Sequence, residues 1–197
     1  MAEIDVSDAG TAPLTLGEVT FAHAWNVRGD PADASLATEA GRVLGLRLPV
    51  DPLTSTGSGS AALLWLGPQS WLYVNGDSSA ARNFDAARRA INAAGGALFD
   101  VSSSYVAWRV AGANAARALN RACPLDLHPS VFGMGQCAQS VLGHINALFH
   151  EPDDASFVVM VARSFAADAW RTLCDAAATN GYRVVDTRAF AYAMRST

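Results

Sequence analysis

The sequence contains no lysine, and all fourteen of its basic side chains are arginine. Charged residues make up only 16% of the 197 positions, and the formal net charge is −4. Proteins that bind nucleic acid through its phosphates generally carry a clustered basic surface, so we expect no nucleic-acid partner. Arginine favours protein interfaces, but nucleotide composition explains the missing lysine more simply because alanine is also abundant.

Cysteine and long apolar runs are scarce as well. The three cysteines are odd in number and have no paired spacing, which fits a reducing compartment better than a disulfide framework. The first residues are acidic and lack the basic and apolar regions of a signal peptide. No run approaches the roughly 20 apolar residues that span a bilayer. We therefore expect a soluble, cytoplasmic protein with no membrane partner.

Apolar residues make up 51% of the chain, enough for the core of one large or two small domains. The first half of the sequence predicts the element order βαββαβ. The expected elements are a strand at 19–27, a helix at 30–45, a hairpin at 61–74, a helix at 78–96 and a strand at 97–101. Asp30 is the candidate N-cap of the first helix, and residues 46–60 are expected to form a loop.

The second half of the sequence predicts the same order again. Its expected elements are a strand at 105–112, a helix at 113–123, a strand pair at 136–150 and 156–162, a helix at 164–181 and a strand at 182–186. The repetition suggests that the chain holds two copies of one unit.

Residue identities at constant spacing support this duplication. At a spacing of 83 positions, Val27, Gly29, Ala32 and Leu36 recur as Val110, Gly112, Ala115 and Leu119. At a spacing of 86 positions, Ser70, Gly95 and Asp100 recur as Ser156, Gly181 and Asp186. We therefore predict an α+β fold of two tandem ferredoxin-like βαββαβ units packed as one body. The expected boundaries are a flexible segment at 1–18, units at 19–102 and 103–187, and a tail at 188–197.

The segment 121–140 gathers Cys123, Asp126, His128 and Cys137 between proline and glycine residues. These residue types could bind zinc, but the paired CxxC spacing of zinc sites is absent. A cysteine and a histidine could also form a nucleophile pair, although no recognised local signature surrounds them. In the structural interpretation, Cys123 is a small buried hydrophobe, and Asp126 and His128 cap a turn or face a partner.

Three further pairs of polar residues are candidates. Arg163 and Ser164 precede a helix, where backbone N–H groups could hold an anion or Ser164 could simply be the N-cap. His144 and His150 are expected on one face of a single strand, solvated or hydrogen-bonded. Asp100 and Asp186 end strands at equivalent places of the two repeats, which favours a structural role in a turn.

Several motifs resemble those of one family. The sequences LRLP, WLGPQSWL, DVS, WRVAG, CPLDLHPSVFGMGQCAQS and ARSFA are similar to the gamma subunit of heterotetrameric sarcosine oxidase. The resemblance extends from about residue 14 to residue 187. It implies the fold of the folate-binding domain of aminomethyltransferases, which is likewise built from ferredoxin-like repeats.

The resemblance also implies a function. The chain would be a non-catalytic subunit that docks on a large flavoprotein subunit, chiefly the alpha subunit, in a complex that oxidatively demethylates sarcosine. FAD, FMN, NAD and tetrahydrofolate would belong to partner subunits, and this chain would hold no cofactor, metal or catalytic residue. Candidate structural or partner-contact residues are Cys123, Asp126, His128, Arg109, Arg163 and Ser164. The alternative is a stand-alone folate-binding or one-carbon-transferring protein, for which Asp100 and Asp186 are the available carboxylates.

Overall fold

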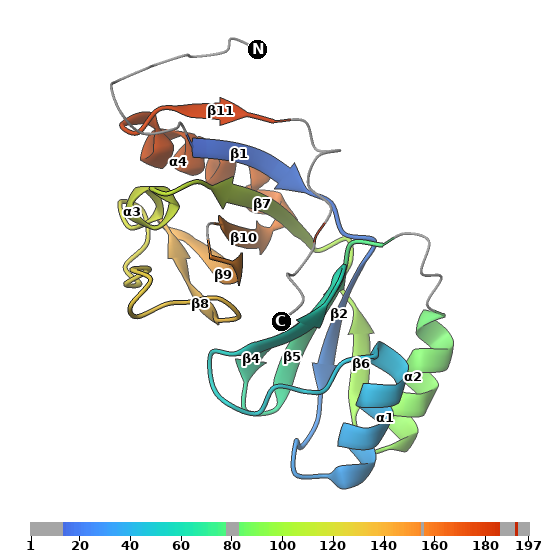
Figure 1. Cartoon of the computed structure of the whole chain (residues 1–197). Coiled ribbons are helices and arrows are strands. Elements are labelled where there is room, and N and C mark those ends of the chain that lie inside the picture. Colours follow the sequence, from blue (N-terminus) through green and yellow to red (C-terminus); the bar gives the residue numbers. More distant parts are fainter. Residues whose placement is uncertain (1–13, 78–82, 155, 186–191, 193–197) are drawn as a thin grey trace. The chain divides into compact units, whose positions relative to one another are not determined.

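The computed structural model describes residues 14–77, 83–154, 156–185 and 192 (Figure 1). The described residues form two compact units. The first unit comprises residues 21–77 and 83–103 together with Tyr192. The second unit comprises residues 14–20, 104–154 and 156–185.

The first unit contains a five-stranded antiparallel sheet and two helices. In chain order its elements are β2 (His23–Arg28), α1 (Ala34–Leu44), β3 (Ser55–Ser58), β4 (Ala61–Gly67), β5 (Ser70–Asn75), α2 (Phe84–Ala93) and β6 (Ala97–Asp100). The strand order is β3-β4-β5-β2-β6. Strand β3 lies within the segment 46–60, which the sequence predicted as a loop. Its residues Ser-Thr-Gly-Ser carry no apolar alternation and pair only at the edge of the sheet.

The second unit contains a six-stranded sheet. Its elements are β1 (Leu14–Val19), β7 (Tyr105–Ala111), α3 (Ala115–Leu119), β8 (Cys137–Leu142), β9 (Ile145–Asp153), β10 (Ser156–Ala162), the 3-10 turn η1 (Arg163–Phe165), α4 (Ala166–Ala178) and β11 (Tyr182–Val184). The strand order is β11-β1-β7-β10-β9-β8. The predicted single strand at 136–150 is a hairpin, because Gly143 adopts a left-handed turn with φ 63°.

The prediction of a flexible segment at 1–18 is wrong for residues 14–18. These residues belong to β1, which lies between β7 and β11 and pairs antiparallel with the former and parallel with the latter. Leu14 and Leu16 enter the core of the second unit, and this alternation stabilises the strand. Residues 1–13 lie outside the described part of the chain, as does the predicted tail apart from Tyr192.

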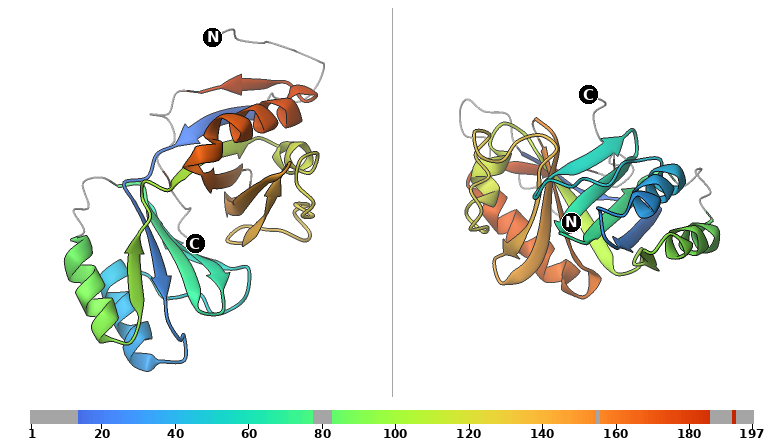
Figure 2. Two further views of the ribbon diagram at one scale, coloured as in Figure 1. Left: turned by 180° about the vertical axis from the view of Figure 1, so that it is seen from behind. Right: turned by 90° about the horizontal axis from the view of Figure 1, so that it is seen from below.

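Helices cover one face of the sheet in each unit. In the first unit α1 and α2 lie side by side over the sheet, as both views of Figure 2 show. Leu36, Ala40 and Leu44 follow one another at four-residue spacing on α1 and are buried. The N-cap of α1 is Asp33, whose Oδ1 accepts from the Ser35 N–H at 2.8 Å. The prediction that Asp30 is the N-cap is therefore wrong.

The repeat spacing coincides with the sheet register. Val27 on β2 pairs with Trp71 on β5, and Val110 on β7 pairs with Phe157 on β10. Val110 lies 83 positions after Val27 and Phe157 lies 86 positions after Trp71, so equivalent residues form equivalent cross-strand pairs.

Two of the recurring identities are glycines with positive φ. Gly29 and Gly112 have φ 152° and 126°, and Gly95 and Gly181 have φ 84° and 69°. Side chains other than glycine rarely adopt these conformations, so the same backbone turns demand glycine in both units. A Cβ on Gly29 would also approach Leu36 Cδ2 to 2.3 Å.

Candidate functional site

The connection after α3 is an ordered loop of the second unit, which we call the 124–136 loop. Asn120 fixes its start, since its side-chain amide donates to the carbonyl of Leu125 and its Oδ1 accepts from the Leu127 N–H at 3.2 Å. Leu127 is fully buried in the core of the unit. The loop is thus attached through both backbone and side chain.

Asp126 and His128 are exposed and shape a turn within this loop. The Asp126 carboxylate accepts from the His128 N–H at 3.0 Å. His128 Nδ1 lies 2.7 Å from Ser130 Oγ, and the His128 carbonyl accepts from the Phe132 N–H at 2.9 Å. These side chains therefore have a local structural role and also remain accessible to a partner.

In each unit, an aromatic residue of the sheet holds the loop that follows the first helix. The two residues, Trp71 and Phe157, occupy equivalent positions of the two sheets. In the first unit the Trp71 indole donates to the Pro49 carbonyl at 2.7 Å. In the second unit the equivalent residue, Phe157, packs its ring 6.1 Å from that of Phe132 in the loop. A hydrogen bond in one unit is replaced by an aromatic contact in the other.

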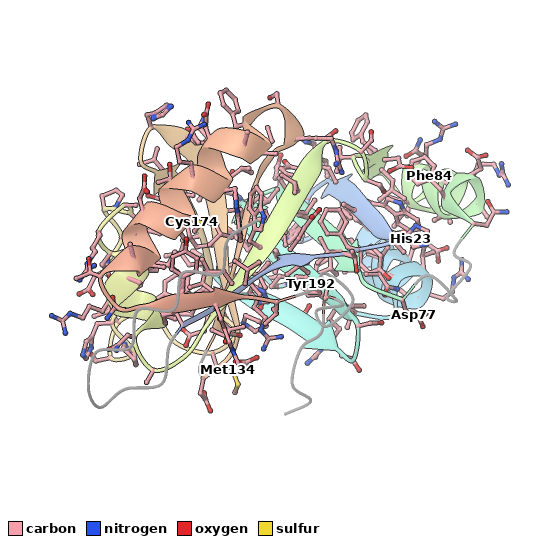
Figure 3. All side chains as sticks on the ribbon, turned by 90° about the horizontal axis from the view of Figure 1, so that it is seen from above. His23, Asp77, Phe84, Met134, Cys174 and Tyr192 are labelled. Carbon is pink, nitrogen blue, oxygen red and sulfur yellow. The ribbon has the colours of Figure 1, made fainter. Side chains whose placement is uncertain are left out.

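The tip of the 124–136 loop presents apolar side chains to solvent. Val131 is 58% exposed and Met134 is 43% exposed. Figure 3 shows Met134 directed away from the ribbon. Two exposed apolar residues close together on an ordered loop make it a candidate contact surface.

The end of the loop pairs with strand β9. The Gly133 N–H donates to Gln136 Oε1 at 2.7 Å, which closes a tight turn. The Gly135 N–H donates to the Glu151 carbonyl at 2.8 Å, and the Glu151 N–H donates to the Gln136 carbonyl at 3.0 Å. Glu151 is thus held directly beside the residues that follow the apolar tip.

The cysteines do not assemble into a metal or thiol site. Cys123 is buried in the core of the second unit, and burial raises its thiol pKa. Cys137 is fully buried on β8, and Cys174 on α4 is half-buried with a pKa that burial again raises. Raised pKa values disfavour the thiolate that a nucleophile needs. Among the residues that the structure describes, no three His, Cys, Asp or Glu side chains are placed to hold a metal ion.

Arg109 forms an ion pair with Asp153. Arg109 lies on β7, and its guanidinium contacts the Asp153 carboxylate at the end of β9. The two side chains are only 20% and 17% exposed. Asp153 also accepts from Ser156 Oγ at 2.9 Å. The motif WRVAG therefore places a half-buried cation against an acid on the other side of β10.

His150 and Glu151 are adjacent buried titratable residues on β9. His150 is fully buried, and burial lowers its pKa to about 3. Glu151 is 3% exposed, and burial together with the charges of Asp154 and Asp153 raises its pKa to about 7. Glu151 Oε2 has no hydrogen-bond partner among the described residues. Within the described part of the chain, this buried acid forms no ion pair.

Arg163 and Ser164 lie in the turn η1 that leads into α4. The Arg163 N–H donates to the Ser104 carbonyl and its guanidinium to the Tyr105 carbonyl, both at 2.9 Å. Ser164 is not the N-cap of α4, because Phe165 occupies that position and makes no side-chain cap. The N-cap prediction for Ser164 is wrong, since the 3-10 turn begins the helical region one residue earlier, at Arg163.

Asp100 and Asp186 are the carboxylates available to the folate-binding alternative. Asp100 ends β6 and accepts from the Ser102 N–H at 2.9 Å and from Ser102 Oγ at 2.6 Å. Ser102 Oγ in turn accepts from the Ala24 N–H at 2.9 Å, so the motif DVS closes the end of the sheet. The predicted structural role of Asp100 is confirmed, whereas Asp186 lies outside the described residues.

Sequence reasoning missed Glu151. The prediction of one strand at 136–150 ended before this residue, and His144 and His150 were expected on one face of that strand. His144 instead lies exposed in the turn after β8, and His150 is fully buried. The signal that was available is the run HEPDD at 150–154, in which three acids follow an apolar strand.

Comparisons with known proteins identify relatives over most of the chain. The family model of the sarcosine oxidase, gamma subunit family matches residues 28–179. The sarcosine oxidase subunit gamma of Corynebacterium sp. (strain U-96) is 30% identical over 85% of this chain and 81% of the relative. That of an Arthrobacter species is 29% identical over 89% of this chain and 86% of the relative.

Two solved structures are also similar. A chain of the heterotetrameric sarcosine oxidase from Corynebacterium sp. U-96, in complex with pyrrole 2-carboxylate, superposes with a TM-score of 0.79 at 28% identity and 87% coverage of both chains. The glycine cleavage system aminomethyltransferase T from Bartonella henselae gives a TM-score of 0.62 at 14% identity, over 89% of this chain and 48% of that protein, which shows a shared fold alone.

The helices of the described residues include none that is both long and apolar enough to cross a membrane. The family match covers well over half of the chain, and the structural match agrees with it. The chain belongs to the sarcosine oxidase gamma subunit family.

Proposed function

We propose that this chain is the gamma subunit of a cytoplasmic, heterotetrameric sarcosine oxidase, which demethylates sarcosine oxidatively. The observation that supports this most strongly is the match at TM-score 0.79 over 87% of both chains to a chain of a solved heterotetrameric sarcosine oxidase. In this proposal FAD, FMN, NAD and tetrahydrofolate are bound by partner subunits. This chain docks on the large flavoprotein subunit, chiefly the alpha subunit, and stabilises it without catalysing a step.

We further propose that each unit is a ferredoxin-like βαββαβ copy and that the two copies arose by duplication of the segments 19–102 and 103–187. The order β4-β5-β2-β6 in the first unit supports this, because it is the order of a split βαβ arrangement. The second unit has the same order in β9-β10-β7-β11, with β1 inserted between the last two strands.

The 124–136 loop is the proposed contact with the large subunit. Val131 and Met134 supply exposed apolar area, and Asp126 and His128 supply exposed polar groups on the same ordered loop. Apolar anchors with a polar surround are the usual composition of a protein interface. Cys123, Arg109 and Arg163 are assigned structural roles in the same unit, and Ser164 lies in the turn η1.

A co-purification experiment tests this contact. The double variant Val131→Ser/Met134→Ser should lose most of its binding to the large subunit while keeping its own fold. Val50→Ser is a matched control, because Val50 is 64% exposed on the corresponding connection of the first unit. Equal retention of the double variant and the control would contradict the assignment of the loop.

A further inference from the structure

Glu151 is a buried acid whose carboxylate forms no ion pair with any residue that the structure describes. The residue is 3% exposed, and its Oε2 has no hydrogen-bond partner within the described part of the chain. Arg109, on β7 and separated from β9 by β10, pairs with Asp153. Burying a charge without a partner is strongly unfavourable, so such an acid either stays protonated or acquires a cationic partner.

The electrostatic surroundings of Glu151 favour a positive ligand. Asp153 and Asp154 are close enough to raise its pKa together with burial. Asp153 is paired with Arg109, so the acid beside Glu151 that presents its charge to solvent is the exposed Asp154. The described residues contain no set of three ligands for a metal ion, which argues against an inorganic cation as the ligand.

Glu151 is also continuous with the exposed apolar tip of the 124–136 loop. The Glu151 N–H donates to the Gln136 carbonyl, and the Glu151 carbonyl accepts from the Gly135 N–H. Met134, which precedes Gly135, is 43% exposed. An acid beside an apolar surface matches arginine and lysine, whose side chains combine an apolar stem with a cationic head.

We propose that Glu151 receives an arginine or lysine side chain of the large subunit, whose stem packs on the apolar tip of the 124–136 loop and whose cationic head pairs with the buried carboxylate. This inference rests on the proposed function and names the chemistry of the partner at that contact. The pair would remove the unfavourable isolation of the carboxylate only in the complex, so docking and the ionisation of Glu151 are coupled.

The coupling between docking and the ionisation of Glu151 predicts a measurable change of affinity with pH. With a free-chain pKa of about 7, roughly a tenth of Glu151 is ionised at pH 6 and roughly nine tenths at pH 8. Affinity for the large subunit should therefore rise about tenfold between pH 6 and pH 8. At pH 7 each binding event should release about half a proton.

The experiment is calorimetric titration of the full chain with the large flavoprotein subunit at pH 6, 7 and 8, in two buffers of different ionisation enthalpy. Glu151→Gln should bind at least about tenfold more weakly at pH 8 and release no proton. Glu39→Gln is the matched control, because Glu39 is paired with Arg42 on the surface of α1, and it should behave like the wild type. Circular dichroism of each variant checks the fold.

The outcomes separate the two proposals. If the wild type binds the large subunit and Glu151→Gln binds equally well with the same proton release, this inference is overturned and the proposed function stands. If the wild type does not bind, the proposed function is overturned and this inference with it. Methylammonium or Mg²⁺ binding to the free wild type but not to Glu151→Gln, with unchanged docking, would identify a small cation as the ligand and also overturn the inference.

Discussion

Replacing Glu151 by glutamine should remove a specific pH dependence from the stability of the free chain. The folded state raises the pKa of Glu151 from 4.5 to about 7, so the folded protein holds this proton more tightly than the unfolded chain. Its stabilising contribution is complete below pH 4.5 and is lost as the pH rises through 7. At about 1.4 kcal/mol per pKa unit, the loss amounts to about 3 kcal/mol.

His150 contributes with the opposite sign but does not confuse the comparison. Its folded pKa of about 3 lies below the ordinary 6.5, so its contribution is present above pH 6.5 and is lost as the pH falls towards 3. Both the wild type and Glu151→Gln retain His150. The difference between their free energies of unfolding therefore reports Glu151.

The assay is urea denaturation of dilute wild type and Glu151→Gln between pH 4.5 and 8.5. The free energy of unfolding of the variant, relative to wild type, should increase by about 3 kcal/mol across this range and level off above pH 8. A part of the free-energy difference that does not change with pH reflects the glutamine amide itself and is not used in the comparison. A difference that stays flat with pH would refute the assignment of Glu151 as a buried acid with a raised pKa.

Four further substitutions test packing and charge. Cys123→Ala should lower the stability of the chain by about 1–2 kcal/mol, with turnover per flavin of the assembled complex unchanged; a hundredfold loss of turnover with normal assembly would refute the structural role. Gly41→Ala should stabilise the chain by about 1 kcal/mol, since no atom lies within 4 Å of the added Cβ. By contrast, Gly96→Ala should destabilise it by about 1–3 kcal/mol, because its Cβ would lie 2.9 Å from a backbone carbonyl; thermal unfolding of both glycine variants checks the order. Arg109→Met should cost about 1–3 kcal/mol by leaving Asp153 without its cation, and a loss equal to that of an exposed arginine would show that the pair is unimportant.

The equivalent turns of the two units could be predicted because both units carry glycine where the backbone requires it. Gly29 in the first unit and Gly112 in the second occupy equivalent turns with positive φ. Gly95 and Gly181 occupy a second pair of equivalent turns. These positions admit few alternatives to glycine, so the spacing between them remains readable in a single sequence.

The place of β1 could not be predicted by the same reasoning. The expected unit began at residue 19, yet Leu14 and Leu16 complete the core of the second unit, far along the chain. Alternation of apolar residues identifies a strand, but pairing with β7 and β11 is a tertiary choice that local sequence does not encode.

The candidate site was predicted only in part. The 124–136 loop was recognised from its proline and glycine residues, and the exposure of Asp126 and His128 agrees with the alternative that they face a partner. Glu151 was missed because an acid at the end of a strand normally lies in solvent. Its burial depends on pairing with Gly135 and Gln136, which the sequence does not reveal.

The most direct test of the central claim is size-exclusion chromatography with light scattering of this chain co-expressed with the large flavoprotein subunit of the same organism. We predict that the two chains elute together in equal amounts, and that the chain alone is colourless, inactive and prone to self-association. Separate elution of the two chains, with tight binding of tetrahydrofolate by this chain alone, would contradict the subunit role and favour a stand-alone one-carbon protein.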